Sequence, residues 1–129
     1  MKLLLDTHEL IWWSSSSEKL SLNVYNLIVD PSNTLMFSIA SIWEMQIKLQ
    51  SGKLNLNSAL SNLIERQQQV NKLQILPIEL SHIYALESLP SHHRDPFDRI
   101  LIAQSIVENI PLLSIDMIFD SYPVQKIWE

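Results

Sequence analysis

Short apolar runs alternate along this chain with longer segments in which apolar residues recur at helical spacing. The runs have the length of buried strands and lie at 2–5, 34–37, 74–78 and 111–115, with a last edge-strand candidate at 123–128. Helices are predicted at 18–29, 38–49, 57–70, 79–89 and 96–107, and another begins near Thr7. This alternation favours a mostly parallel sheet, because parallel strands need long crossover connections. We therefore predict an α/β fold with helices on both faces of a central sheet.

The composition is that of an ordinary globular protein, and we predict a single domain at 1–129. Hydrophobic residues make up 47% and charged residues 18%, and 129 residues leave no room for a second independent core. The absence of cysteine excludes disulfides and thiolate metal sites. The apolar start ends at Asp6, too early for a signal peptide, and no stretch approaches the roughly 20 apolar residues of a membrane span. We predict a cytoplasmic protein.

The net charge of the chain is −5. This value argues against a protein that holds nucleic acid through a broad positive surface. A nucleic-acid substrate would therefore need positive charge that is supplied locally. Divalent cations bound among acidic side chains would supply it.

Two aspartates directly follow predicted strands. Asp6 comes after the strand at 2–5, and Asp116 follows the strand at 111–115. Sites in parallel sheets lie outside the carboxyl ends of the strands, so both carboxylates are expected at the edge where a site would form. Each aspartate taken alone is better explained as the cap of the helix or turn that follows it.

A second pair of acids lies on predicted helices. Asp95 fits the N-cap of the helix at 96–107, Pro96 its first position and Asp98 its third, where an acid offsets the helix dipole. Glu44 is four residues before Lys48, which suits an exposed ion pair. The helix around Glu44 is apolar over much of its circumference, however, so a partly enclosed carboxylate that needs a partner is the alternative.

Together these four acids suit a metal site. Carboxylate oxygens are the hard ligands that Mg²⁺ or Mn²⁺ prefers, and carboxylates crowded without a cation would repel one another. One or two such ions beside a phosphodiester can activate a water and stabilise the leaving oxygen. We predict metal-dependent hydrolysis, with Asp6, Glu44, Asp98 and Asp116 as catalytic metal ligands.

The order of several short motifs resembles that of the PIN domain family, and within it the VapC-like toxins of bacterial toxin–antitoxin pairs. The matching residues are Leu4-Leu5-Asp6-Thr7-His8, Ser38-Ile39-Ala40-Ser41-Ile42-Trp43-Glu44, Gly52-Lys53-Leu54, Asp95-Pro96-Phe97-Asp98-Arg99 and Leu113-Ser114-Ile115-Asp116. The resemblance implies a PIN-like three-layer fold and a metal-dependent endoribonuclease. It implies the same four acids as metal ligands, with Thr7 and Ser114 supporting the site. Ser114 stands where the family usually has Thr, which keeps the hydroxyl.

The resemblance also implies partners: an RNA substrate, a cognate antitoxin and a second copy in a homodimer. Residues that could contact substrate phosphates without reading the sequence are Lys48, Lys53, His92, His93, Arg94 and Arg99. His8 could approach the cleft or be turned away from it by the helix. Asp95 is expected to support the site as a helix cap rather than to bind metal. Trp12, Trp13 and Trp128 suit core burial or, alternatively, a dimer or antitoxin interface.

The alternative function is a non-catalytic module for Mg²⁺-dependent signalling or protein interaction. A receiver-like module needs a phospho-accepting aspartate after a central strand and a lysine after a later strand, and neither 34–38 nor 112–116 supplies them. A pure binding module, whose acids are only caps and surface charge, predicts no thermal stabilisation by Mn²⁺.

Overall fold

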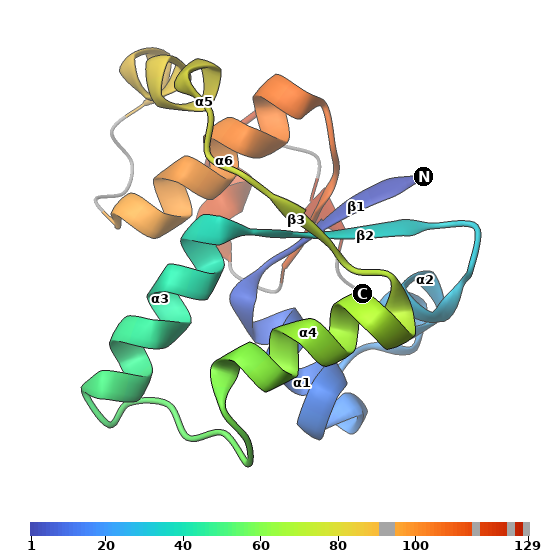
Figure 1. Ribbon diagram of the computed structural model, residues 1–129. Coiled ribbons are helices and arrows are strands. Elements are labelled where there is room, and N and C mark those ends of the chain that lie inside the picture. Colours follow the sequence, from blue (N-terminus) through green and yellow to red (C-terminus); the bar gives the residue numbers. More distant parts are fainter. Residues whose placement is uncertain (91–94, 115–116, 124–125, 128–129) are drawn as a thin grey trace.

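A five-stranded parallel sheet forms the centre of the protein (Figure 1). The structure is a computed structural model that describes residues 1–90, 95–114, 117–123 and 126–127. The strands are β1 (Lys2–Leu5), β2 (Thr34–Ser38), β3 (Gln74–Leu76), β4 (Leu112–Leu113) and β5 (Lys126–Ile127). Their order is β3-β2-β1-β4-β5, and every neighbouring pair is parallel. The predicted α/β class is confirmed, and the last predicted strand lies at the sheet edge as expected.

In the residues that the structure describes, six α-helices connect and cover the strands. They are α1 (Thr7–Ser15), α2 (Leu22–Val29), α3 (Ile39–Gln50), α4 (Leu60–Asn71), α5 (Leu80–Ala85) and α6 (Pro96–Glu108). Three short 3₁₀ helices are η1 (Ser17–Lys19), η2 (Leu86–Ser88) and η3 (Met117–Ser121). None of the helices in the described ranges combines the length and apolar character that crossing a membrane requires.

The core has two parts, one on each face of the sheet. Leu3 and Leu5 pack into one cluster with residues of α1, α2, α3 and α4, whereas Leu4 packs into the other with residues of α6 and η3. This division follows from the strand period, since successive side chains point to opposite faces. Trp12 and Trp13 pack partly buried against the first cluster, so core packing is confirmed for both. Helices on both faces give the predicted three layers (Figure 1).

Some predicted boundaries are wrong for local reasons. The helix predicted from residue 18 begins at Leu22, because the Ser21 side chain caps it by accepting from the Val24 N–H at 3.1 Å. The helix predicted from residue 57 begins at Leu60, since Asn57 and the serine after it favour turns. The strand predicted at 74–78 is shorter, because Pro77 has no N–H for a sheet hydrogen bond. The helix predicted at 79–89 tightens after residue 85 into a 3₁₀ turn.

The end of α3 is well defined, as the single glycine predicts. Gly52 adopts a φ of 76°, in the left-handed region. Its N–H donates to the Leu49 carbonyl at 3.3 Å, and the Lys53 N–H donates to the Lys48 carbonyl at 2.9 Å. These two bonds form a Schellman motif, which satisfies the last carbonyls of the helix. The turn therefore sets the direction in which the chain leaves α3 at Lys53.

We expect Gly52→Ala to lower the free energy of unfolding by about 1–2 kcal/mol, the strain of a left-handed residue that carries a Cβ. A Cβ at this position would meet no atom within 4 Å, so the loss would come from the backbone alone. Urea denaturation measures the change. Gly52→Asn is the control and should lose less, because asparagine tolerates this conformation. Equal stability of the alanine variant and the wild type would contradict the assignment.

Candidate metal centre

Asp6 lies at the carboxyl end of β1 and is only 6% exposed. One carboxylate oxygen accepts from the Thr7 N–H at 2.7 Å, and the other accepts from the Ser114 hydroxyl at 2.8 Å. Ser114 is in reach because β1 and β4 are parallel neighbours, with the Asp6 N–H donating to the Leu113 carbonyl at 3.0 Å. Asp6 is thus a helix cap, as predicted, and also a buried anion at the sheet edge.

Burial raises the pKa of Asp6, because a charged carboxylate loses its hydration in the interior. The hydrogen bonds from Ser114 and Thr7 and the nearby His8 oppose this effect, while the negative charge of Glu44 adds to it. The ionised form of Asp6 is therefore destabilised in the folded chain. A cation beside the carboxylate would relieve that cost.

Glu44 lies on α3 and is connected to Asp6 through hydrogen bonds to Thr7. Its Oε1 accepts from the Thr7 hydroxyl at 2.9 Å, and its Oε2 lies 3.5 Å from the Lys48 ammonium nitrogen. The Glu44 side chain is 13% exposed, so the prediction of a partly enclosed carboxylate is confirmed together with the ion pair. Thr7 thus orients Glu44 through its side chain while its backbone N–H holds Asp6.

The start of α6 brings two more acids to Glu44. Asp95 caps the helix by accepting from the N–H groups of Phe97 at 2.9 Å and Asp98 at 3.3 Å, with Pro96 at the first turn. Single carboxylate oxygens of Glu44, Asp95 and Asp98 all lie within 4.8 Å of one another. Two oxygens bound to one Mg²⁺ at 2.0–2.1 Å are at most about 4.2 Å apart, so small side-chain movements would complete this set around an ion.

Asp95 is the member of this set that sequence reasoning underrated. The sequence predicts only a supporting role for it as a helix cap, yet one of its carboxylate oxygens lies within 4.8 Å of oxygens of both Glu44 and Asp98. The available signal was its spacing, since residues three apart lie on the same face of a helical turn. Spacing near the start of α6 cannot reveal that α3 brings the Glu44 carboxylate close to the same face.

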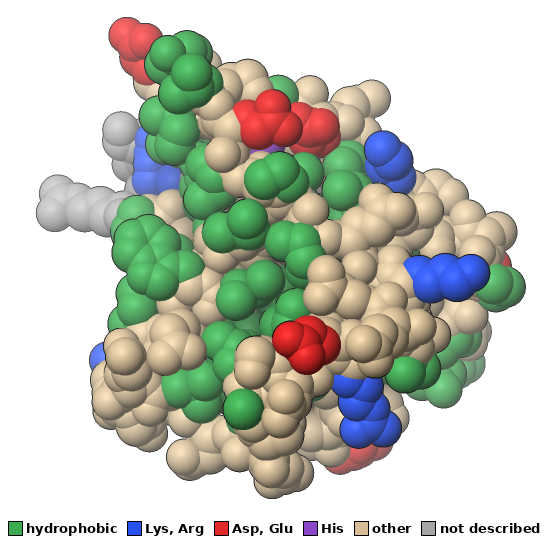
Figure 2. Space-filling model, viewed as in Figure 1, with side chains coloured by type: hydrophobic (Ala, Val, Ile, Leu, Met, Phe, Trp, Pro, Cys, Tyr) green, Lys and Arg blue, Asp and Glu red, His purple; other side chains and the backbone are tan. Residues whose placement is uncertain are grey.

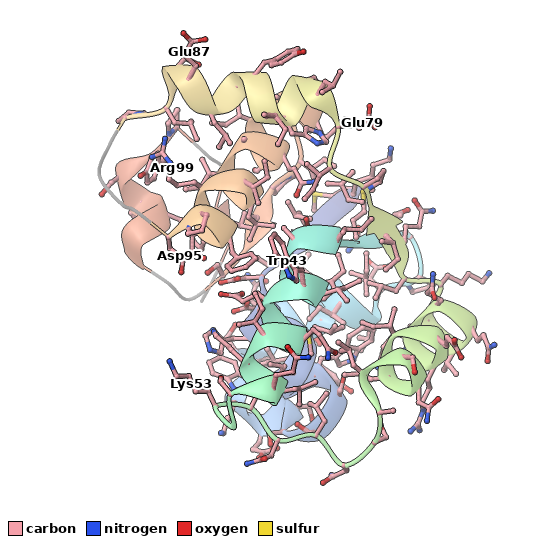
Figure 3. The ribbon with its side chains drawn as sticks, turned by 60° about the vertical axis from the view of Figure 1, so that its left-hand side comes forward. Trp43, Lys53, Glu79, Glu87, Asp95 and Arg99 are labelled. Carbon is pink, nitrogen blue, oxygen red and sulfur yellow. The ribbon has the colours of Figure 1, made fainter. Side chains whose placement is uncertain are left out.

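Two further predicted site residues, Arg99 and His8, lie among the described residues. Arg99 donates to the Pro90 carbonyl at 3.0 Å and to the Leu86 carbonyl at 3.3 Å, which ties α6 to η2 and to the residue at 90 that follows it (Figure 3). These bonds hold the guanidinium against backbone carbonyls, and its substrate role stays a prediction. His8 is exposed, with its ring centroid 5.7 Å from that of Trp12. The candidates outside the described residues are Asp116, His92, His93, Arg94 and Trp128.

A cavity of about 540 Å³ adjoins the acids. Its lining residues come from the end of α3, the turn that follows and the start of α6: Glu44, Ile47, Lys48, Ser51, Lys53, Asp95, Pro96 and Phe97. Figure 3 shows Lys53 on the same side of the molecule as Asp95. The cavity therefore brings carboxylates, ammonium groups and an apolar surface together.

The fold and the site define an α/β domain in which carboxylates converge at the carboxyl edge of a parallel sheet. A model of the PIN domain family matches residues 3–124. The chain therefore belongs to the PIN domain family, and the resemblance drawn from the sequence is confirmed. A comparison with curated proteins gave no match.

Solved structures of similar fold include VapBC and FitAcB proteins. VapBC2 from Rickettsia felis, bound to a promoter DNA fragment, has a TM-score of 0.75 at 16% identity, with 100% of each chain covered. FitAcB from Neisseria gonorrhoeae has a TM-score of 0.65 at 14% identity, covering 97% of this chain and 96% of that one. DNA-bound VapBC from Salmonella typhimurium has a TM-score of 0.67 at 13% identity, covering 98% and 97%. At these identities the likeness is one of fold.

We expect Asp6→Asn to stabilise the metal-free protein at neutral pH. Asparagine keeps an oxygen for the Thr7 cap but carries no charge. The folded-state pKa of Asp6 is raised above the ordinary value of 3.8. The free energy of unfolding of the wild type therefore falls as the pH rises from 3.8 through the folded-state pKa, and it stays lower at pH 7. The gain should be about 1.4 kcal/mol for each pKa unit of the shift.

Urea denaturation in EDTA at neutral pH and again below the ordinary aspartate pKa measures this difference. The advantage of the variant should vanish at the acidic pH, where Asp6 is protonated in both the folded and the unfolded chain. A variant less stable than the wild type at neutral pH would contradict the electrostatic explanation.

Proposed function

We propose that the protein is a metal-dependent endoribonuclease and the toxin of a toxin–antitoxin pair. The observation that carries this proposal is the approach of the Glu44, Asp95 and Asp98 oxygens to within 4.8 Å. Three anions this close repel one another unless a cation lies among them. Membership of the PIN domain family and the fold of the VapBC relatives support the same function.

The donor set fits Mg²⁺ or Mn²⁺, since all of its atoms are carboxylate oxygens. When bound, one or two such ions would neutralise phosphate charge and make a water nucleophilic near neutral pH. The ligands that we assign are Asp6, Glu44, Asp98 and Asp116, joined by Asp95. Asp116 enters this set on its motif alone.

The surrounding residues preorganise these ligands. Ser114 holds one oxygen of Asp6, and Thr7 holds Glu44 in one orientation. Lys48 lies against the second oxygen of Glu44, so it limits the negative charge that the cleft presents to a phosphate. Fixed ligands avoid reorganisation when the substrate binds.

The partners that we propose are a cognate antitoxin and a second copy of this chain, in the cytoplasm. Ile39, Trp43 and Ile47 on α3 are 44%, 60% and 40% exposed, and their spacing of four residues makes an apolar stripe. The ring of Trp43 also meets that of Phe97 edge-on, with 5.2 Å between centroids. Figure 2 shows hydrophobic side chains gathered over this part of the face. Such a surface is typical of a protein interface.

The first test is metal binding, measured by thermal unfolding with increasing Mn²⁺. Ligand that binds only the folded state stabilises it by about 2.7 kcal/mol at a hundred times the Kd. We expect a rise in Tm for the wild type and a much smaller rise for Asp98→Asn. Glu65→Gln, which removes a carboxylate from the exposed surface of α4, is the matched control and should respond like the wild type. An equal rise in all three proteins would refute this site.

The second test is cleavage of a mixed RNA pool. We expect Mg²⁺ or Mn²⁺ to support cutting and EDTA to stop it. Asp98→Asn should reduce the rate at least about a hundredfold, the scale seen when one preorganised electrostatic group is lost from an active site. Cleavage that continues in EDTA or in purified Asp98→Asn would overturn the mechanism. Metal binding without cleavage of any RNA would favour the alternative function, a non-catalytic module.

A further inference from the structure

The cavity beside the acids is lined by both acidic and basic side chains. Glu44 and Asp95 belong to the candidate metal centre. Lys48 and Lys53 line the cavity from the end of α3 and just after it. A cation bound by the acids would join the two ammonium groups in attracting phosphate oxygens.

Apolar side chains make up most of the remaining lining. Ile47 comes from α3, while Pro96 and Phe97 come from the first turn of α6. Phe97 is held in place because its ring meets Trp43 at an interplanar angle of 82°. A fixed aromatic ring beside aliphatic side chains is a surface on which a flat nucleobase can stack.

The two lysines are not equivalent. Lys48 is already paired with Glu44 at 3.5 Å, whereas Lys53 is exposed and makes no ion pair within the part of the chain that the structure describes. The backbone of Lys53 is fixed by the bond from its N–H to the Lys48 carbonyl. Lys53 is therefore the positive group that remains for a ligand.

We propose that this cavity binds the nucleotide next to the scissile phosphate, with its base on Phe97 and its outer phosphate on Lys53. The inference rests on the proposed nuclease function and assigns two residues to substrate binding beside that site. The volume of about 540 Å³ lies in the range of small-ligand sites. A base inside an A-form duplex is stacked and paired, so it cannot stack on the Phe97 ring.

The test measures the affinity for a short, fluorescently labelled 2′-O-methyl oligonucleotide of mixed sequence, which resists hydrolysis, by anisotropy in Mn²⁺. Lys53→Gln should weaken binding severalfold and reduce the slope of log affinity against log salt by about 0.7, the value for one phosphate contact on a single strand. Lys53→Arg should restore binding. Phe97→Leu keeps an apolar side chain but removes the ring, and we expect a loss of about fivefold or more.

Lys72→Gln is the matched control. It removes the same charge from an exposed lysine at the end of α4, outside this cavity, and should bind like the wild type. Thermal unfolding checks that each variant is folded. In the cleavage assay, Lys53→Gln should raise KM with little change in kcat.

Each outcome separates this inference from the nuclease function. Binding of single strands that depends on Lys53 and Phe97, without cleavage, would support the subsite and overturn the nuclease. Cleavage with unchanged affinity and KM in both variants would overturn the subsite and leave the nuclease intact. Equal weakening by Lys72→Gln, equal affinity for the annealed duplex, or no binding at all would also overturn the subsite.

Discussion

The parallel pairing of β1 with its two neighbours is the constraint on which the site depends. The pairing of β1 with β4 places Asp6 next to Ser114, which is 108 residues away in the sequence. The pairing of β1 with β2 makes Ser38 and the start of α3 emerge at the same edge. In the second turn of α3, Glu44 accepts a hydrogen bond from the Thr7 hydroxyl. Without this register, the acids would be separate helix caps and surface charges.

Repulsion between negative charges held close together then determines the chemistry of this edge of the sheet. Asp6 is buried and its pKa is raised, while Glu44 adds a second negative charge in the same region. Hydroxyl and N–H donors offset part of this charge, and so does the ammonium group of Lys48. Asp95 and Asp98 bring further negative charge to Glu44 from α6. The folded chain thus maintains an arrangement that a divalent cation would stabilise, which is common for a functional site and unusual for a purely structural one.

Local signals in the sequence predicted much of the architecture because short-range chemistry controls helix ends and strand faces. Asp95 and Pro96 marked the start of α6, Gly52 marked the end of α3, and the apolar run before Asp6 marked a buried strand. Predicted ends of helices and strands were wrong where another local interaction ended the element. The Ser21 side chain, for example, caps α2 and so fixes where that helix begins. Pro77 is another, because it cannot take part in the sheet.

Residue type and spacing along the chain were enough to predict the fold class and the family, and they supplied the candidate acids. Which of the described acids come together depends on the tertiary structure. Asp95 joins Glu44 and Asp98 because α3 and α6 pack against each other, and no spacing within either helix records that contact. The same packing places Lys53 and Phe97 on one cavity. These contacts depend on the register of the sheet and the packing of the helices, which involve residues far apart in the chain.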